Sequence, residues 1–184
     1  MSEGGRQLIL NRLFARLYGN PVVRNDLRGE LVEEIIGLAL EPDWALCGAD
    51  WGGCDLIHEA TGLRMQVKQS AARQSWSAGA PSAQPTPRFS IAQKTGRWEG
   101  ATWIPGAGRN AELYVFAWHP VVTDDCDHAD AAQWLFHVVP ERALPPTKSI
   151  GLPQVRALAE PVDMASLRAT VERTLAALRG APAP

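Results

Sequence analysis

"GCDLIHEATGLRMQVKQS", residues 53–70, is the stretch that decides the fold. Apolar and polar residues alternate on both sides of a short turn signal. This pattern predicts two antiparallel strands, roughly 53–59 and 63–69, joined as a hairpin. The hairpin also carries an aspartate near its start and a glutamine and a lysine near its end, which hydrophobic packing does not require.

The predicted register brings these polar side chains together. With the turn near Ala60 and Thr61, Asp55 lies opposite Gln66, and directly opposed residues project to the same side of a sheet. Gln66 and Lys68 share one face because side chains alternate along a strand. A slip of one residue would send Asp55 to the other face, so the register is a testable prediction.

Such a cluster suits phosphodiester hydrolysis. The Asp55 carboxylate is a hard oxygen ligand of the kind that Mg²⁺ or Mn²⁺ takes, and the Gln66 side-chain oxygen and the Val67 backbone carbonyl can add two more. Lys68 can orient a water molecule or neutralise charge that grows in the transition state. A glutamate from the preceding helix can add an acceptor behind the metal.

These residues resemble the core of a known family. Asp55, ten intervening residues and then Gln66-Val67-Lys68 is similar to the motif of the PD-(D/E)XK nucleases, the restriction-endonuclease-like superfamily, in a QxK variant. The resemblance covers about residues 24–140. The C-terminal half also resembles a group of bacterial proteins with a similar hairpin.

The helix upstream of the hairpin strengthens the resemblance. The stretch "GELVEEIIGLAL" resembles the first helix of that fold, in which a glutamate often faces the active site. The family pattern maps this glutamate to Glu33, with Glu30 as the neighbouring candidate. The resemblance therefore implies a catalytic set of Asp55, Gln66, Lys68 and Glu33.

The resemblance implies a Mg²⁺-dependent nuclease that cleaves DNA, often as a homodimer. Glutamine at position 66, where the family usually has an acid, is a neutral and weaker ligand. It also fits a second hypothesis, a catalytically degenerate nuclease fold that binds nucleic acid or a protein partner. A surface hairpin with incidental polar residues and a small-molecule enzyme with a deep apolar pocket remain open as well.

The whole-chain properties are those of a single globular domain over residues 1–184. The chain is 46% hydrophobic and 21% charged, with net charge −2, so a nucleic-acid partner requires a local basic patch. Three cysteines without regular spacing indicate reduced thiols, and no 18-residue apolar run is present. We therefore expect a cytoplasmic protein without a membrane span.

The order of the predicted elements indicates an α/β fold. A central mixed sheet flanked by helices on both sides, of the restriction-endonuclease-like kind, satisfies this order. One apolar stripe of the second helix is predicted to contain Leu27, Leu31, Ile35 and Leu38, widened by Val32, Ile36 and Ala39. Asn25 or Asp26 can cap the start of this helix. The predicted helices are 5–18, 25–41 and 163–179, the remaining strands are 44–47, 88–92, 111–120 and 133–140, and an irregular insert covers 71–111.

The insert is the candidate nucleic-acid surface. It combines basic residues with the tryptophans Trp76, Trp98 and Trp103, a composition suited to backbone contact and base stacking. DNA is the expected partner, with RNA as the alternative. The predicted nucleic-acid contacts are Gln69, Arg73, Arg88, Lys94 and Arg97.

A zinc site is not expected. His119, Cys126, His128 and His137 follow no standard ligand spacing. His128 is predicted to lie in an acidic surface loop over 122–132, and His137 in an apolar strand.

Overall fold

The computed structural model describes residues 3–47, 53–76, 86–99 and 102–180. Its helices are α1 (Glu3–Tyr18), α2 (Asn25–Leu40), α3 (Leu152–Leu158) and α4 (Met164–Gly180). Its strands are β1 (Trp44–Leu46), β2 (Leu56–His58), β3 (Arg64–Ala71), β4 (Arg88–Ser90), β5 (Lys94–Glu99), β6 (Thr102–Gly108), β7 (Leu113–His119), β8 (Leu135–Pro140) and β9 (Ser149–Gly151). Two short 3₁₀ helices, Ala131–Gln133 and Glu141–Ala143, flank β8.

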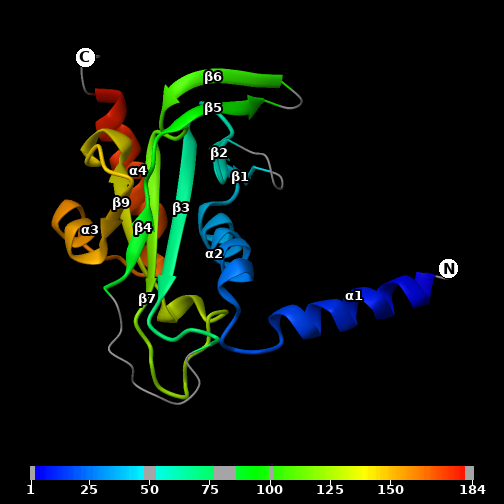
Figure 1. The fold of residues 1–184 in the computed structure, drawn as a ribbon. Coiled ribbons are helices and arrows are strands. Elements are labelled where there is room, and N and C mark those ends of the chain that lie inside the picture. Colours follow the sequence, from blue (N-terminus) through cyan, green and yellow to red (C-terminus); the bar gives the residue numbers. More distant parts are fainter. Residues whose placement is uncertain (1–2, 48–52, 77–85, 100–101, 181–184) are drawn as a thin grey trace.

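A mixed five-stranded sheet forms the centre of the fold, with strand order β1-β2-β3-β7-β8 (Figure 1). Only the β3–β7 pair is parallel, and the other pairs are antiparallel. The chain connects β3 to β7 through the segment that contains β4, β5 and β6. The α/β prediction of a central mixed sheet flanked by helices is confirmed.

The hairpin of β2 and β3 has the predicted register. Leu56 pairs with Met65 and Ile57 with Arg64, and continuing this pairing places Asp55 opposite Gln66. The turn uses Gly62, whose φ of 68° lies in the left-handed region that glycine adopts at little cost. The structured strands are offset from the predicted ranges, because residues 53–55 bend before β2 begins and β3 continues to Ala71.

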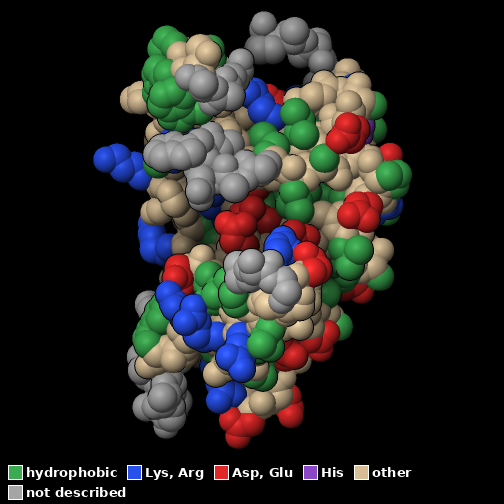
Figure 2. All heavy atoms as spheres, turned by 90° about the vertical axis from the view of Figure 1, so that its right-hand side faces the viewer, with side chains coloured by type: hydrophobic (Ala, Val, Ile, Leu, Met, Phe, Trp, Pro, Cys, Tyr) green, Lys and Arg blue, Asp and Glu red, His purple; other side chains and the backbone are tan. Residues whose placement is uncertain are grey.

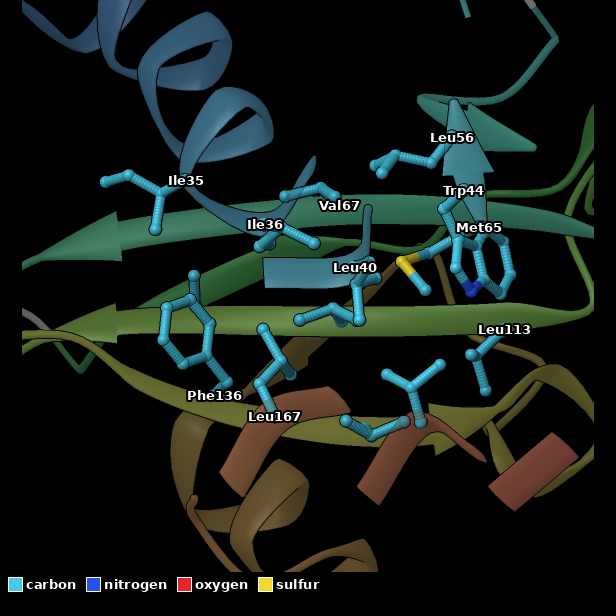
Figure 3. Packing of buried hydrophobic residues seen from close by; sticks show 14 of the residues in the cluster. Ile35, Ile36, Leu40, Trp44, Leu56, Met65, Val67, Leu113, Phe136 and Leu167 are labelled. Carbon is cyan, nitrogen blue, oxygen red and sulfur yellow. The ribbon is translucent and has the colours of Figure 1, made fainter. Parts of the chain in front are cut away.

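Helices α2 and α4 cover one face of the sheet (Figures 1 and 3). Met65 and Val67 of β3 pack there against Ile36 and Leu40 of α2, and Leu167 of α4 completes the cluster. This core holds the helix that carries Glu33 against the strand that carries Lys68.

The second helix buries most of the predicted apolar face but not all of it. Val32, Ile35 and Ile36 are buried as predicted, whereas Leu38 is 70% exposed. The predicted cap is also wrong, since Arg24 precedes the helix and no side chain caps it. At the last helix the Asp163 carboxylate accepts a hydrogen bond from the Ser166 backbone N–H at 2.8 Å.

The predicted irregular insert contains regular structure. β4 pairs with β9 beside the opposite face of the sheet, where Phe89 and Ile150 join a second apolar cluster with α3. β5 and β6 form a two-stranded hairpin that extends from one end of the sheet (Figure 1). The sequence analysis missed this hairpin, β9 and α3.

Helix α1 extends away from the rest of the protein (Figure 1). None of its residues is buried, and Phe14 is 67% exposed. Among the described residues, none of the helices combines the length and the apolar character that crossing a bilayer requires.

Replacing Ile36 by alanine tests the packing of α2. Ile36 is fully buried between α2 and the sheet, so Ile36→Ala is expected to lower the free energy of unfolding by about 2–5 kcal/mol. The matched control on the same helix is Leu38→Ala, which is expected to change it by less than about 0.5 kcal/mol because Leu38 is exposed. Urea denaturation followed by circular dichroism measures both, and equal losses in the two variants would contradict this packing.

Candidate active site

Asp55 lies beside β3, on the side of β2 and directly before β2 begins. Its backbone N–H donates to the Met65 carbonyl at 2.9 Å, which fixes the main chain against β3. Its carboxylate oxygen Oδ2 accepts a hydrogen bond from the Val67 backbone N–H at 2.6 Å and another from the Gln66 side-chain amide. The carboxylate thus occupies the position that a longer β2 would fill with a backbone carbonyl.

Gln66 and Lys68 project from the same face of β3. In the parallel register they lie beside Tyr114 and Phe116 of β7, whereas Val67 points into the core under α2. The predicted juxtaposition of Asp55 with Gln66 is present as a direct hydrogen bond. Lys68 belongs to the same electrostatic cluster, because its charge acts on the pKa of Asp55.

Glu33 faces this cluster from α2. Burial is the main cause that raises the pKa of Glu33 to about 7, and the negative charge of Asp55 acts in the same direction. The positive charge of Lys68 opposes the rise in this pKa. Glu33 is therefore the helix glutamate that lies close to the hairpin residues, whereas Glu30 is exposed.

Burial shifts the pKa values of Asp55 and Lys68 in the directions that favour their neutral forms. The pKa of Asp55 is raised by desolvation, against the opposing effect of Lys68. The pKa of Lys68 is lowered by desolvation, against the opposing effects of Asp55 and Glu33. The three groups therefore share a poorly hydrated space in which each charge depends on the others.

Lys94 is a further member of the cluster. It begins β5, and its positive charge lowers the pKa values of both Asp55 and Lys68. The sequence predicts Lys94 as a nucleic-acid contact, and nothing in the sequence indicates that it lies near Asp55 and Lys68. The structure adds it because the β5–β6 hairpin starts beside the end of the sheet that carries Asp55.

The donor set fits a hard divalent cation. Asp55 and Glu33 supply carboxylates, and the negative charge of Asp55 helps to raise the pKa of Glu33. Gln66 has a side-chain oxygen besides the amide group that donates to Asp55. Figure 2 shows acidic side chains gathered with basic ones near the middle of one face of the molecule. A cation would relieve the repulsion between the two carboxylates more directly than the lysines do.

The other predicted nucleic-acid contacts lie in separate places. Gln69 accepts a hydrogen bond at 2.7 Å from Arg28, and Arg73 bonds to the Thr123 carbonyl and to Asp124. Arg88 donates to the Ser149 hydroxyl at 2.8 Å. The Arg97 side chain lies outside the described residues. The stretch after Lys68 continues as β3 to Ala71.

The hairpin of β5 and β6 carries the exposed aromatic pair Trp98 and Trp103, whose rings meet edge to face at 5.5 Å between centroids. Arg109, a basic residue of the same segment, serves the fold instead. Its buried guanidinium bonds to Glu141 at 2.9 Å and to the carbonyls of Ile91 and Pro145.

Arg28 of α2 is a buried cation that the sequence analysis missed. It is 1% exposed and donates to the side-chain oxygens of Gln69, Gln74 and Asn25. Burial lowers its pKa to about 10. The signal in the sequence was its position four residues before Val32, on the stripe that the helix buries.

His119, Cys126 and His128 gather in the core, so the prediction of a surface position for His128 is wrong. Their possible ligand atoms lie within 4.8 Å of one another, and all three residues are buried. The His128 Nδ1 accepts a hydrogen bond from the Val23 N–H at 3.1 Å. Burial is the main cause that lowers the pKa values of both histidines, and the positive charge of Arg28 acts in the same direction. His137 lies elsewhere, with its Nδ1 2.7 Å from the Ala159 carbonyl.

A scan of protein-family models finds no match. A search of curated proteins finds none either. Among solved structures, the bacterial homing endonuclease I-Ssp6803I is similar, with 18% identity over 85% of this chain and 99% of that chain, and a TM-score of 0.44. A likeness at this level does not establish a shared activity.

The raised pKa of Glu33 can be measured directly. In the metal-free protein with ¹³C-labelled glutamate, the side-chain carboxyl of Glu33 is expected to titrate near pH 7. Asp55→Asn is expected to lower this pKa and Lys68→Met to raise it, because each removes a neighbouring charge. Glu33→Gln assigns the signal by its loss, and a midpoint near 4.5 would refute this electrostatic coupling.

The raised pKa of Glu33 also makes the stability of the fold depend on pH. The folded-state pKa of Glu33 exceeds its ordinary value of 4.5, so the stabilisation that its proton provides is complete below pH 4.5 and is lost as the pH rises to about 7. Glu33→Gln is expected to remove this part of the pH dependence in urea denaturation.

Proposed function

We propose that this chain is a divalent-metal-dependent nuclease that hydrolyses DNA phosphodiester bonds, with a restriction-endonuclease-like site. The observation that carries the proposal is the meeting of Asp55, Gln66 and Lys68 at the edge of β3, with Glu33 facing them from α2. This combination of oxygen donors and a desolvated amine is the one that the sequence motif implies.

The chain's own residues have separate roles in this proposal. Asp55, Gln66 and the Val67 carbonyl would hold Mg²⁺ or Mn²⁺, which polarises a phosphoryl oxygen and lowers the pKa of a bound water. Lys68 orients the attacking water and neutralises charge on the phosphate. Glu33, partly protonated near neutral pH, completes the donor set and releases its proton as a cation enters. Water attacks phosphorus in line and the 3′ oxygen leaves.

The β5–β6 hairpin is the proposed support for the DNA strand. It places Lys94 near the site and presents Trp98 and Trp103 to solvent. A positive charge and flat aromatic rings favour a phosphate backbone and unstacked bases. RNA as the preferred substrate is the alternative that competition between the two nucleic acids would reveal.

Removal of the site lysine tests catalysis. Lys68→Ala is expected to reduce cleavage of a supercoiled plasmid in Mg²⁺ or Mn²⁺ by at least about 100-fold, because it removes the buried amine that is proposed to neutralise charge on the phosphate. Lys148→Ala is the matched control, since Lys148 is exposed and is expected to leave the rate unchanged. Agarose electrophoresis follows the loss of supercoiled DNA, and linear product at early times would indicate two sites acting together in a homodimer.

Cleavage that survives Lys68→Ala would exclude this site as the source of the activity. Cleavage that disappears equally in Lys148→Ala would indicate a general effect of lost positive charge. Thermal denaturation of both variants separates loss of folding from loss of chemistry.

A degenerate nuclease fold that binds DNA or a protein partner without cutting is the second candidate. The observation in its favour is the Gln66 amide, which donates to the Asp55 carboxylate. This hydrogen bond satisfies part of the carboxylate without a metal, and the neutral amide weakens the attraction for a cation. DNA binding without cleavage would support this candidate.

The substitution Gln66→Glu distinguishes the two. A second carboxylate beside Asp55 is expected to tighten Mn²⁺ binding by roughly tenfold, about 1.4 kcal/mol, in isothermal titration calorimetry. A nuclease that already works with glutamine should bind Mn²⁺ before the change. Wild-type protein that shows neither Mn²⁺ binding nor cleavage, while Gln66→Glu gains both, would favour the degenerate fold. Unchanged Mn²⁺ affinity would contradict the proposed metal position.

A further inference from the structure

Two cysteines lie in contact directly beside the candidate active site. Cys47 follows β1 and Cys54 precedes Asp55, and their sulfur atoms are 2.7 Å apart. This separation is well below the roughly 3.5–4.0 Å at which non-bonded heavy atoms attract best. Both thiols are free, and the sulfurs need to approach by only about 0.7 Å to reach the disulfide bond length of about 2.05 Å.

The backbone holds the two cysteines in this position independently of any bond between them. The Cys47 N–H donates to the Asp55 carbonyl at 2.9 Å, which continues the antiparallel pairing of Leu46 with Leu56. The chain bends over residues 53–55, so that Cys54 turns toward Cys47 across the two strands. A cross-link would therefore join two segments that backbone pairing already holds side by side.

The exposure of the two thiols sets an order of reaction. Cys47 is half-buried, whereas Cys54 is 8% exposed. An external oxidant thus reaches Cys47 first, and Cys54 is the neighbouring thiol that completes the bond. The third cysteine, Cys126, is buried beside His119 with its sulfur 4.0 Å from the ring nitrogen, and it provides an internal reference.

We propose that Cys47 and Cys54 are a reversible disulfide pair, oxidised by a small-molecule disulfide such as oxidised glutathione. The Cys47 sulfur attacks one glutathione sulfur, which breaks the glutathione disulfide and releases one glutathione thiol. The Cys54 sulfur then attacks the Cys47 sulfur and releases the second glutathione. The two cysteine hydrogens end on the two glutathione thiols, so glutathione takes up both electrons.

The cross-link joins the end of β1 to the residue bonded to Asp55. It closes a short loop and so restricts the unfolded chain, which stabilises the native fold. It also fixes the main chain that carries the Asp55 carboxylate. The oxidation state of this pair therefore sets how firmly the edge of the candidate active site is held, whether or not the chain cleaves DNA.

Peptide mapping of the full-length protein tests the pair. The reduced chain is incubated with oxidised glutathione, denatured, alkylated and digested with trypsin. Both cysteines fall in the tryptic peptide 29–64, which contains no internal lysine or arginine. This peptide is expected to become lighter by two hydrogen atoms and to resist alkylation until dithiothreitol is added. Cys126 is expected to remain alkylated under all conditions.

Thermal denaturation provides the second measurement. The oxidised wild type is expected to melt about 5 °C above the reduced form, since closing a loop of this size gives a moderate stabilisation. Cys47→Ser is expected to lose both the mass change and the difference in melting temperature, whereas Cys126→Ser is expected to keep both.

Three outcomes would overturn the proposal. They are full alkylation of peptide 29–64 after oxidation, a stable mixed disulfide of Cys47 with glutathione, and disulfide-linked dimers in place of the internal bond. Because the mass of the wild-type peptide is itself decisive, the test does not depend on whether a serine variant folds.

Discussion

The hydrogen bond from the Val67 backbone N–H to the Asp55 carboxylate is the interaction on which the candidate site depends. The pairing of β2 with β3 stops at Leu56 and Met65. The next β3 backbone N–H on the β2 side is that of Val67, and it bonds to the Asp55 carboxylate because β2 supplies no backbone carbonyl there. A side-chain carboxylate takes the place of a backbone carbonyl, so the same group completes the sheet edge and carries the negative charge. A charge-assisted hydrogen bond of this kind is stronger than a neutral one.

The charged groups around this bond are stabilised mainly by one another. Burial shifts the pKa values of Glu33, Asp55 and Lys68 in the direction that favours the neutral form. A neighbour of opposite charge opposes the shift of each pKa. Lys94 adds a second positive charge from outside the sheet. Burying unpaired charges is costly, so such a cluster is more readily explained by a ligand or a reaction than by stability.

A second polar network supports the site from behind. Arg28 connects the start of α2 to Gln69 at the far end of β3, using only neutral side-chain oxygens. Burial lowers the pKa values of His119 and His128 beside Trp134, and the charge of the same guanidinium acts in the same direction. This network joins the first turn of α2 to the end of β3, the two elements that carry Glu33 and Lys68.

The sequence by itself determined the hairpin and the juxtaposition of Asp55 with Gln66, because strand alternation and a nearby turn are local properties that fix a register. It also determined the long helices and the mixed sheet. Tertiary structure alone decided that Leu38 faces solvent, that Lys94 joins the site and that His128 is buried. The physical reason is that helical periodicity defines a stripe only to within a residue or two, and the sheet selects the side that is buried. β5 and β6 escaped prediction because glycines and a proline interrupt their alternation, and they form through pairing with each other.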